Sequence, residues 1–461
     1  MKEFIKRVSW VTIANATAMI VSALITIVLP KYISITEYGY WQMYLLYVTY
    51  IGCIHLGLPD GIYLRYSGEK YEDIVTNEIK LLFWMSSLFE CIVGAAIYCY
   101  VCRSSIQQLA LAFGLCTVVY VPSLYLKYLI LASNMMKQYS LYVLSEKIVS
   151  AVAIILGIFL LRPILFNFIY VDIVGKMVGF VYALVVCKSC FRVRWQITNN
   201  LWIELKLNIV AGICLMISTI SSNFIVGVIR LFINQQWSIE DFGKVSLSLQ
   251  ISNFVLTFVR AVSLPLFPVL KKRGKDESVV LYEKIRLVLV SLILFVFIFY
   301  YPLATFLNYW LPEYRISVYY LGVLFPICLF EAKQALLCET YLKKIRKERL
   351  LLLINVSTML LSVVISGIIV FGLENQMLAI VFILIILCFR STISELFLNK
   401  CMGKQSIKHC VVEFFMVATF AISNVYMQLK DAAIIYFVCF IVFVLINKNG
   451  YKSLIEKRGE K

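Results

Sequence analysis

The hexapeptide Ser34-Ile35-Thr36-Glu37-Tyr38-Gly39 recurs in altered form as Ser238-Ile239-Glu240-Asp241-Phe242-Gly243. The two copies share the pattern Ser-Ile-x-acid-aromatic-Gly at an offset of 204 residues. Further matches recur at an offset of 206: Gly57-Leu58-Pro59 with Ser263-Leu264-Pro265, Lys127 with Lys333, and Lys137 with Lys343. A nearly constant offset over such a distance indicates an internal duplication. The chain is therefore predicted to contain two homologous halves.

Long apolar runs surround both copies of this motif. The 461 residues are 62% hydrophobic and 15% charged, with a mean hydropathy of +0.88, whereas soluble domains are about half apolar and a quarter charged. Runs such as Val11–Leu29, Leu81–Val101 and Leu350–Phe371 have the length of a membrane-spanning helix and lack the alternation of a barrel strand. The sequence therefore predicts an all-α integral membrane protein.

Charge clusters and turn residues divide the chain into about fourteen predicted spans. They cover residues 9–30, 41–64, 81–101, 108–132, 141–161, 164–186, 208–229, 245–269, 287–307, 316–342, 351–371, 376–398, 409–428 and 432–447. Six spans in each half is an even number, so the halves are predicted to be parallel repeats. The predicted parts are an N-terminal lobe at 1–205, a C-terminal lobe at 206–405, an extra helix pair at 406–448 and a tail at 449–461. Weak divisions at Arg162-Pro163 and Lys430-Asp431 leave a count of twelve open.

The distribution of basic residues predicts the orientation. With the N-terminus in the cytoplasm, inner loops and termini collect 30 of the 43 Lys and Arg residues, as the positive-inside rule expects. Both termini are therefore predicted to be cytoplasmic. This asymmetry also accounts for the net charge of +17 without nucleic-acid binding. With only two histidines, and with most cysteines inside apolar runs, no metal site and no cofactor are predicted.

The duplicated halves, the final helix pair and the segments 38–42 and 56–66 resemble the Wzx-type polysaccharide flippases of the MOP exporter superfamily. That superfamily also contains the lipid II flippases and the MATE drug exporters. The resemblance covers essentially the whole chain in topology and residues 34–73 in sequence. It implies a two-lobed transporter that moves undecaprenyl-pyrophosphate-linked oligosaccharide units across the bacterial cytoplasmic membrane by alternating access, for O-antigen, capsule or exopolysaccharide synthesis. Association with the polysaccharide polymerase machinery is a further implied partnership.

Charged residues inside predicted spans are candidate site residues, because a charge in hydrocarbon is costly unless it faces the protein interior. A pyrophosphate needs cations to replace its hydration, and the candidates for that role are Arg260, Lys333, Lys127 and Lys176. Polar side chains at helical spacing are candidates to line the same central cavity: Asn15, Asn223, Gln250 and Asn253. Ion pairing and hydrogen bonding between packed helices are the alternative for these positions.

Acidic residues inside spans are candidates for ion coupling. Asp60, Glu90 and Asp172 are the residues considered for antiport of H⁺ or Na⁺, and the sequence does not decide between the two ions. Asp172 and Lys176 are four residues apart, which is the spacing of an ion pair on one helix face. Prolines interrupt spans at matching places in the two halves, at Pro59 and at Pro265, and these places are candidate hinges.

Two alternatives belong to other functional classes. A MATE-type exporter of cationic drugs has the same topology, but such exporters have an acid on the first span, and none occurs in 9–30 here. A membrane-embedded polysaccharide polymerase needs a large outer loop for its chemistry, and the longest predicted outer loop is 230–244. The chain is therefore predicted to be a transporter and not an enzyme.

Overall fold

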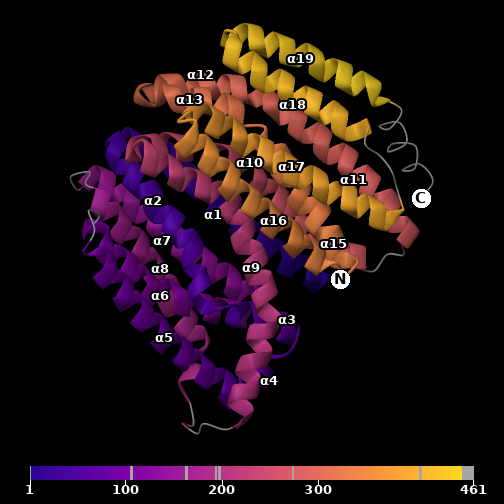
Figure 1. The fold of residues 1–461 in the computed structure, drawn as a ribbon. Coiled ribbons are helices and arrows are strands. Elements are labelled where there is room, and N and C mark those ends of the chain that lie inside the picture. Colours follow the sequence, from indigo (N-terminus) through magenta and orange to yellow (C-terminus); the bar gives the residue numbers. More distant parts are fainter. Residues whose placement is uncertain are drawn as a thin grey trace. The chain divides into compact units, whose positions relative to one another are not determined.

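The computed structural model is helical throughout the ranges that it describes (Figure 1). It describes residues 2–103, 107–160, 165–192, 195, 199–271, 275–403 and 408–448, and no strand occurs within them. By its internal contacts the chain divides into two compact units, Met1–Asn223 and Phe224–Lys461. The all-α membrane architecture predicted from the sequence is confirmed.

The first unit begins with the long helix α1 and ends within α9. Its elements are α1 (Lys2–Val28), η1 (Leu29–Lys31), α2 (Ile35–Ile51), η2 (Gly52–His55), α3 (Leu58–Tyr66), α4 (Tyr71–Ile74), α5 (Asn77–Val101), α6 (Gln107–Ala132), α7 (Met136–Leu160), α8 (Leu165–Val186), η3 (Lys188–Phe191) and the first part of α9 (Asn199–Gln236). Helix α7 packs against α1 and α8, and α5 packs against α6.

The second unit continues α9 and adds the remaining helices. They are α10 (Ile239–Lys271), α11 (Lys275–Val296), η4 (Phe297–Phe299), α12 (Tyr300–Trp310), η5 (Pro312–Tyr314), α13 (Arg315–Leu324), α14 (Ile327–Ala332), η6 (Lys333–Glu339), α15 (Thr340–Lys344), α16 (Glu348–Gly367), η7 (Ile368–Gly372), α17 (Gln376–Met402), α18 (Lys408–Tyr426) and α19 (Leu429–Ile446). Of these, η6 and η7 are π-helical.

Twelve of the fourteen predicted spans meet the length and hydropathy of a membrane span among the described residues. Ten are single helices, and two are helix pairs bent at a short break. The predicted span 409–428 is the shorter apolar helix Cys410–Tyr426. The span 245–269 is helical within α10, but most side chains beyond residue 256 lie outside the described part. A count of fourteen therefore stays a prediction.

The repeated hexapeptide starts a helix in each half. Ser34 Oγ accepts the Glu37 N–H at 3.2 Å, and Glu37 Oε2 accepts the Ser34 N–H at 3.0 Å. In the second copy, Ser238 Oγ accepts the Asp241 N–H at 3.0 Å and donates to the Asp241 carboxylate at 2.7 Å. Both arrangements satisfy N–H groups that the first helical turn leaves free. The recurring Ser-x-x-acid spacing is therefore a helix N-cap.

Two spans are broken rather than continuous. Helices α2–η2 and α3 meet at 65°, where Leu56 and Gly57 both adopt left-handed backbone with φ of 52° and 78°. The segments 312–324 and 327–344 meet at 50° around Pro326. The predicted hinge at Pro59 thus lies beside a real break. The second break occurs at Pro326 and not at Pro265, through which α10 runs as one helix.

The division between the units falls inside α9, later than the predicted boundary after residue 205. The first part of α9 is held to α3 by a close backbone crossing of Gly57 and Gly61 with Gly212. It is also held by a bidentate ion pair between Arg65 and Glu204. Arg65 Nη1 lies 2.6 Å from Glu204 Oε1, and Nη2 lies 3.3 Å from Oε2. These contacts account for the assignment of residues 206–223 to the first unit.

The C-terminal helix pair belongs to the second unit. Aromatic rings of α18 and α19 pack on η4, with Phe420 and Tyr436 centred 4.9 and 5.8 Å from Phe297. Tyr436 also donates a hydrogen bond to the Leu294 carbonyl at 2.9 Å. The pair therefore packs on the second unit's own helices and does not form a separate body.

Candidate functional site

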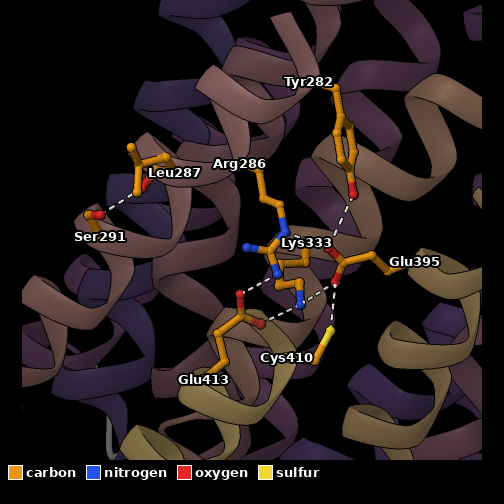
Figure 2. A network of polar contacts seen from close by, with 8 residues as sticks. All are labelled: Tyr282, Arg286, Leu287, Ser291, Lys333, Glu395, Cys410 and Glu413. Atoms are coloured by element: carbon orange, nitrogen blue, oxygen red, sulfur yellow. Dashed lines mark hydrogen bonds and ion pairs between the residues drawn. The ribbon is translucent and has the colours of Figure 1, made fainter. Parts of the chain in front are cut away.

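Four charged side chains form a closed network inside the second unit (Figure 2). Lys333 Nζ lies 2.6 Å from Glu395 Oε2 and 2.5 Å from Glu413 Oε2. Arg286 Nε lies 2.5 Å from Glu395 Oε1, and Arg286 Nη2 lies 2.6 Å from Glu413 Oε1. Each cation contacts both carboxylates, so two positive charges balance two negative charges. We call Arg286, Lys333, Glu395 and Glu413 the ion quartet.

The ion quartet is almost fully removed from solvent. The side chains of Lys333 and Glu395 are 1% exposed, and that of Glu413 is 3% exposed. Tyr282 and Cys410 complete the shell by donating to Glu395 at 3.1 and 3.7 Å. Charges at this depth are tolerated only when paired and hydrogen-bonded. The pairing of each cation with both carboxylates explains how four charged side chains are accommodated in a buried part of the helical bundle.

The quartet joins four elements of the second unit. Arg286 comes from α11, Lys333 from η6, Glu395 from α17 and Glu413 from α18. Helix α18 belongs to the predicted extra helix pair, and the other three elements belong to the predicted C-terminal lobe. Glu413 also ties the extra helix pair to the lobe.

One member of this network, Lys333, is among the site residues predicted from the sequence, as a candidate substrate cation. Arg286, Glu395 and Glu413 are not among those candidate site residues. The available signal is the four-residue spacing of Tyr282 and Arg286, which puts both on one helix face. Both carboxylates of the quartet engage Lys333 in this structure, so its proposed contact with substrate stays a prediction.

Lys176 is also internally paired. Its ammonium forms a buried ion pair with Asp172, as their spacing predicted, and Tyr44 donates to the same Asp172 oxygen at 2.9 Å. Lys176 Nζ lies 5.7 and 5.6 Å from the ring centroids of Tyr44 and Tyr120, within the range of a cation–π contact. Asp172, a candidate for ion coupling, is thus neutralised by a fixed cation in this conformation.

Lys127 differs from the other described candidate cations. Its ammonium lies 5.9 and 5.7 Å from the ring centroids of Tyr139 and Tyr142. The side chain is half-buried, and no carboxylate lies within 4 Å of it in the described part of the chain. Aromatic faces attract a cation but carry no negative charge, so these ring contacts do not balance the charge of an ammonium as a carboxylate would. Arg260 belongs to α10, but its side chain lies outside the described residues.

The four predicted cavity-lining amides fall in both units. Asn15 is half-buried on α1, and Asn223 is exposed on α9, where its carbonyl accepts the Tyr50 hydroxyl at 3.0 Å. Gln250 is half-buried and Asn253 is exposed on α10. Their gathering around one cavity stays a prediction.

Two buried carboxylates of the first unit have no Lys or Arg within 4 Å among the described residues. Asp60 is 7% exposed, lies beside His55 and is hydrogen-bonded by Tyr128. Glu90 is 1% exposed on α5, and its Oε2 has no hydrogen-bond partner in the described part. Both were candidates for ion coupling. Unlike Asp172, neither carries a cation that would hold it ionised.

The Cys187/Cys190 pair lies just beyond α8 and is buried. Burial raises the pKa of the Cys190 thiol to about 11 and that of Cys187 to about 12. Because the thiolate is the reactive form, both residues are expected to react slowly with a maleimide near pH 8 and faster as the pH rises towards these values. Peptide mass spectrometry after timed labelling checks this, with exposed Cys401 as the fast internal standard. Equal rates for the three thiols in folded protein would contradict the burial of the pair.

Comparison with known proteins identifies the fold. No protein-family model matches the chain, and no curated protein matches it. The structure of the lipid II flippase MurJ in an inward closed conformation superposes with a TM-score of 0.59 at 13% identity, covering 95% of this chain and 99% of that one. A MATE in complex with MaL6 gives a TM-score of 0.60 at 12% identity and covers 86% of this chain and 96% of that one.

A third similar structure is a MOP superfamily transporter from Pyrococcus furiosus. It has a TM-score of 0.52 at 12% identity and covers 91% of this chain and 96% of its own length. The chain therefore has the fold of the MOP superfamily transporters. The expected MOP-type helical fold is confirmed.

Proposed function

We propose that this protein is a flippase for undecaprenyl-pyrophosphate-linked oligosaccharide units in the bacterial cytoplasmic membrane. The observation that carries the proposal is the likeness to the lipid II flippase MurJ over 95% of the chain. The MATE in complex with MaL6 covers 86%. The larger coverage of this chain by the lipid II flippase is what we expect if α18 and α19 have a counterpart in that protein. A lipid-linked cargo is therefore favoured over a small water-soluble one.

The charges of the proposed carrier suit a pyrophosphate headgroup. In the first unit, the Lys127 ammonium has no carboxylate within 4 Å among the described residues. In the second unit, Arg260 is a candidate from the sequence, and its side chain lies outside the described part. Lys176 and Lys333 are held by carboxylates, so we assign them to shaping their lobes in this conformation. An anion crossing a low-dielectric region needs cations that are not already neutralised. Among the described candidates, Lys127 is therefore the residue proposed to contact the pyrophosphate. Arg260 stays a separate proposal that rests on the sequence.

The function is tested in a strain that lacks its own polysaccharide flippase. Expression of this protein is expected to restore surface polysaccharide and to lower the accumulated lipid-linked intermediate. Because the accepted glycan is unknown, strains that make different repeat units are compared in parallel. Unchanged intermediate in every strain, with protein present in the membrane, would refute the proposed cargo.

Single substitutions test the two proposed cations. Lys127→Gln and Arg260→Gln are each expected to lower export at least tenfold, because each removes a positive charge proposed to contact the pyrophosphate. The matched control is Arg315→Gln, which removes a cation from an exposed position at the start of α13 and is expected to leave export unchanged. Membrane levels of each variant are measured by immunoblot. Full export by both Lys127→Gln and Arg260→Gln would show that neither residue is needed to contact the pyrophosphate.

A MATE-type exporter of small molecules is the second candidate, because a MATE superposes with a TM-score of 0.60. It predicts that expression raises resistance to cationic drugs in a strain without efflux pumps. Restored drug resistance without restored polysaccharide would favour this function over the flippase.

A further inference from the structure

The break between η2 and α3 brings an imidazole and a carboxylate together inside the first unit. His55 is the last residue of η2, and Asp60 lies in the first turn of α3. The two left-handed residues between them, Leu56 and Gly57, interrupt the helix. His55 Nε2 lies 3.8 Å from Asp60 Oδ2, and the two residues are 9% and 7% exposed. The break thus places a titratable pair within a spanning segment.

The hydrogen bonds around this pair determine where a proton can bind. The Gly57 N–H donates to His55 Nδ1 at 3.0 Å. That nitrogen is therefore an acceptor, and the ring hydrogen of a neutral imidazole sits on Nε2, which faces Asp60. Adding a proton to Nδ1 would break the bond from Gly57. An additional proton consequently binds more easily to the Asp60 carboxylate than to the ring.

Neighbouring elements supply hydrogen bonds but no fixed positive charge. From α6, Tyr128 hydrogen-bonds Asp60, and Asp60 also accepts from its own backbone N–H. The adjacent Lys127 directs its ammonium at the rings of Tyr139 and Tyr142. From α9, Asn208 and Gly212 pack against the glycines of α3, and neither is titratable. No Lys or Arg of the described chain lies within 4 Å of Asp60.

Asp60 differs from the other buried carboxylates described above in the combination of hydrogen-bond donors and the absence of a nearby Lys or Arg. Asp172 and the two acids of the ion quartet each form ion pairs with a Lys or Arg side chain, so the loss of their negative charge would leave those cations unbalanced. Glu90 has the opposite limitation, because its Oε2 lacks any hydrogen bond that would stabilise an anion. Of these buried carboxylates, Asp60 is the one that has hydrogen-bond donors for its charged form and no Lys or Arg within 4 Å among the described residues.

We propose that Asp60 is the proton-binding site that couples transport to a proton gradient, with His55 as a positioning residue. The proton comes from water and binds a carboxylate oxygen, which neutralises the buried charge. When Asp60 loses this proton, its carboxylate becomes a buried anion without a Lys or Arg partner. That state is favoured only if water reaches the break between η2 and α3. Protonation would thereby bias the angle between α2 and α3. This role rests on the proposed transport function, whereas the proton site itself is a property of the first unit.

The proton site is tested without any cargo. Infrared difference spectra of the purified full-length protein in lipid vesicles are recorded at a series of pH values from about pH 5 to about pH 8, which includes the range in which a histidine side chain can change its charge. The wild type is expected to lose the band of one protonated carboxyl as the pH rises. Asp60→Asn is expected to lack that titration, and His55→Gln is expected to shift its midpoint. Asp73→Asn, an exposed acid on α4, is the matched control and is expected to titrate as the wild type.

Some results of this experiment would contradict the proton site, and comparison with complementation tests the proton site separately from the proposed function. An unchanged titrating band in Asp60→Asn, or its loss in Glu90→Gln instead, would overturn the assignment. A band that disappears on adding NaCl at constant pH and ionic strength would overturn the choice of ion in favour of Na⁺. Asp60→Glu keeps a carboxyl and is expected to retain a titrating band, which controls for misfolding of Asp60→Asn. If complementation fails while the titration behaves as expected, the proton site stands and only the proposed cargo is wrong.

Discussion

Lys333→Met is expected to destabilise the second unit by about 3–5 kcal/mol, because it leaves the buried carboxylates of Glu395 and Glu413 with one cation between them. The measurement is the temperature at which purified protein in detergent loses its monodisperse size-exclusion peak. We expect a large fall in this temperature and reduced protein in the membrane. If the proposed function is correct, export is expected to be lost as well, because the second unit is destabilised.

The charge-balanced double variant makes this explanation testable. Lys333→Met combined with Glu413→Gln removes one cation and one anion, so the remaining Arg286–Glu395 pair stays neutral and most of the lost stability is expected to return. Lys343→Met is the control, because Lys343 pairs with Glu339 where the side chains are 39% and 31% exposed. An exposed pair contributes at most about 1 kcal/mol. If the single and double variants melted alike, charge balance would not be what the quartet provides.

Gly61→Ala and Gly212→Ala are expected to disrupt the crossing of α3 and α9. A Cβ on Gly61 would lie 1.8 Å from the Asn208 carbonyl oxygen, and one on Gly212 would lie 2.0 Å from that of Gly57. Both clashes are with backbone, which cannot rotate away as a side chain can. Overpacking of this kind costs about 1–3 kcal/mol and occasionally more. We expect each variant to melt well below the wild type in the same assay.

The same methyl group at an open position serves as the control. A Cβ on Gly367 of α16 would approach nothing closer than Phe232 Cε2 at 3.8 Å, an ordinary contact. Gly367→Ala is therefore expected to keep or slightly raise stability, since alanine favours a helix over glycine. Equal losses at Gly61, Gly212 and Gly367 would mean that helix composition, and not the close crossing, determines the effect.

The membrane class and most spans were predictable because they depend on hydropathy, which is local. A run such as Leu81–Val101 is predicted to span the membrane from its own length and apolar composition, without knowledge of its neighbours in the fold. The repeated Ser-x-x-acid motif was visible as a duplication, and the structure adds that it caps a helix in each half. Asp172 and Lys176 were predicted as a pair for the same reason, because a spacing of four is fixed by helix geometry.

Partners on different helices could not be predicted in this way. Glu413 meets Lys333 across 80 residues of sequence, and no periodicity within either helix indicates which face of another helix lies opposite. The prediction of a second hinge at Pro265 was wrong, and the break lies at Pro326. A proline in the sequence does not by itself show whether the helix continues through it or ends there.

The amino-acid sequence alone determined that this chain is a duplicated, multi-span helical membrane protein with charges buried in its spans, because hydropathy and spacing act within single helices. Tertiary structure decided which of those charges are neutralised. It closed Lys176 and Lys333 into ion pairs and left Lys127 on aromatic faces. It also placed Asp60 at a helix break beside His55, with no Lys or Arg of the described residues within 4 Å. The physical reason is that a buried charge is governed by the groups within a few ångströms of it, and packing between helices chooses those groups.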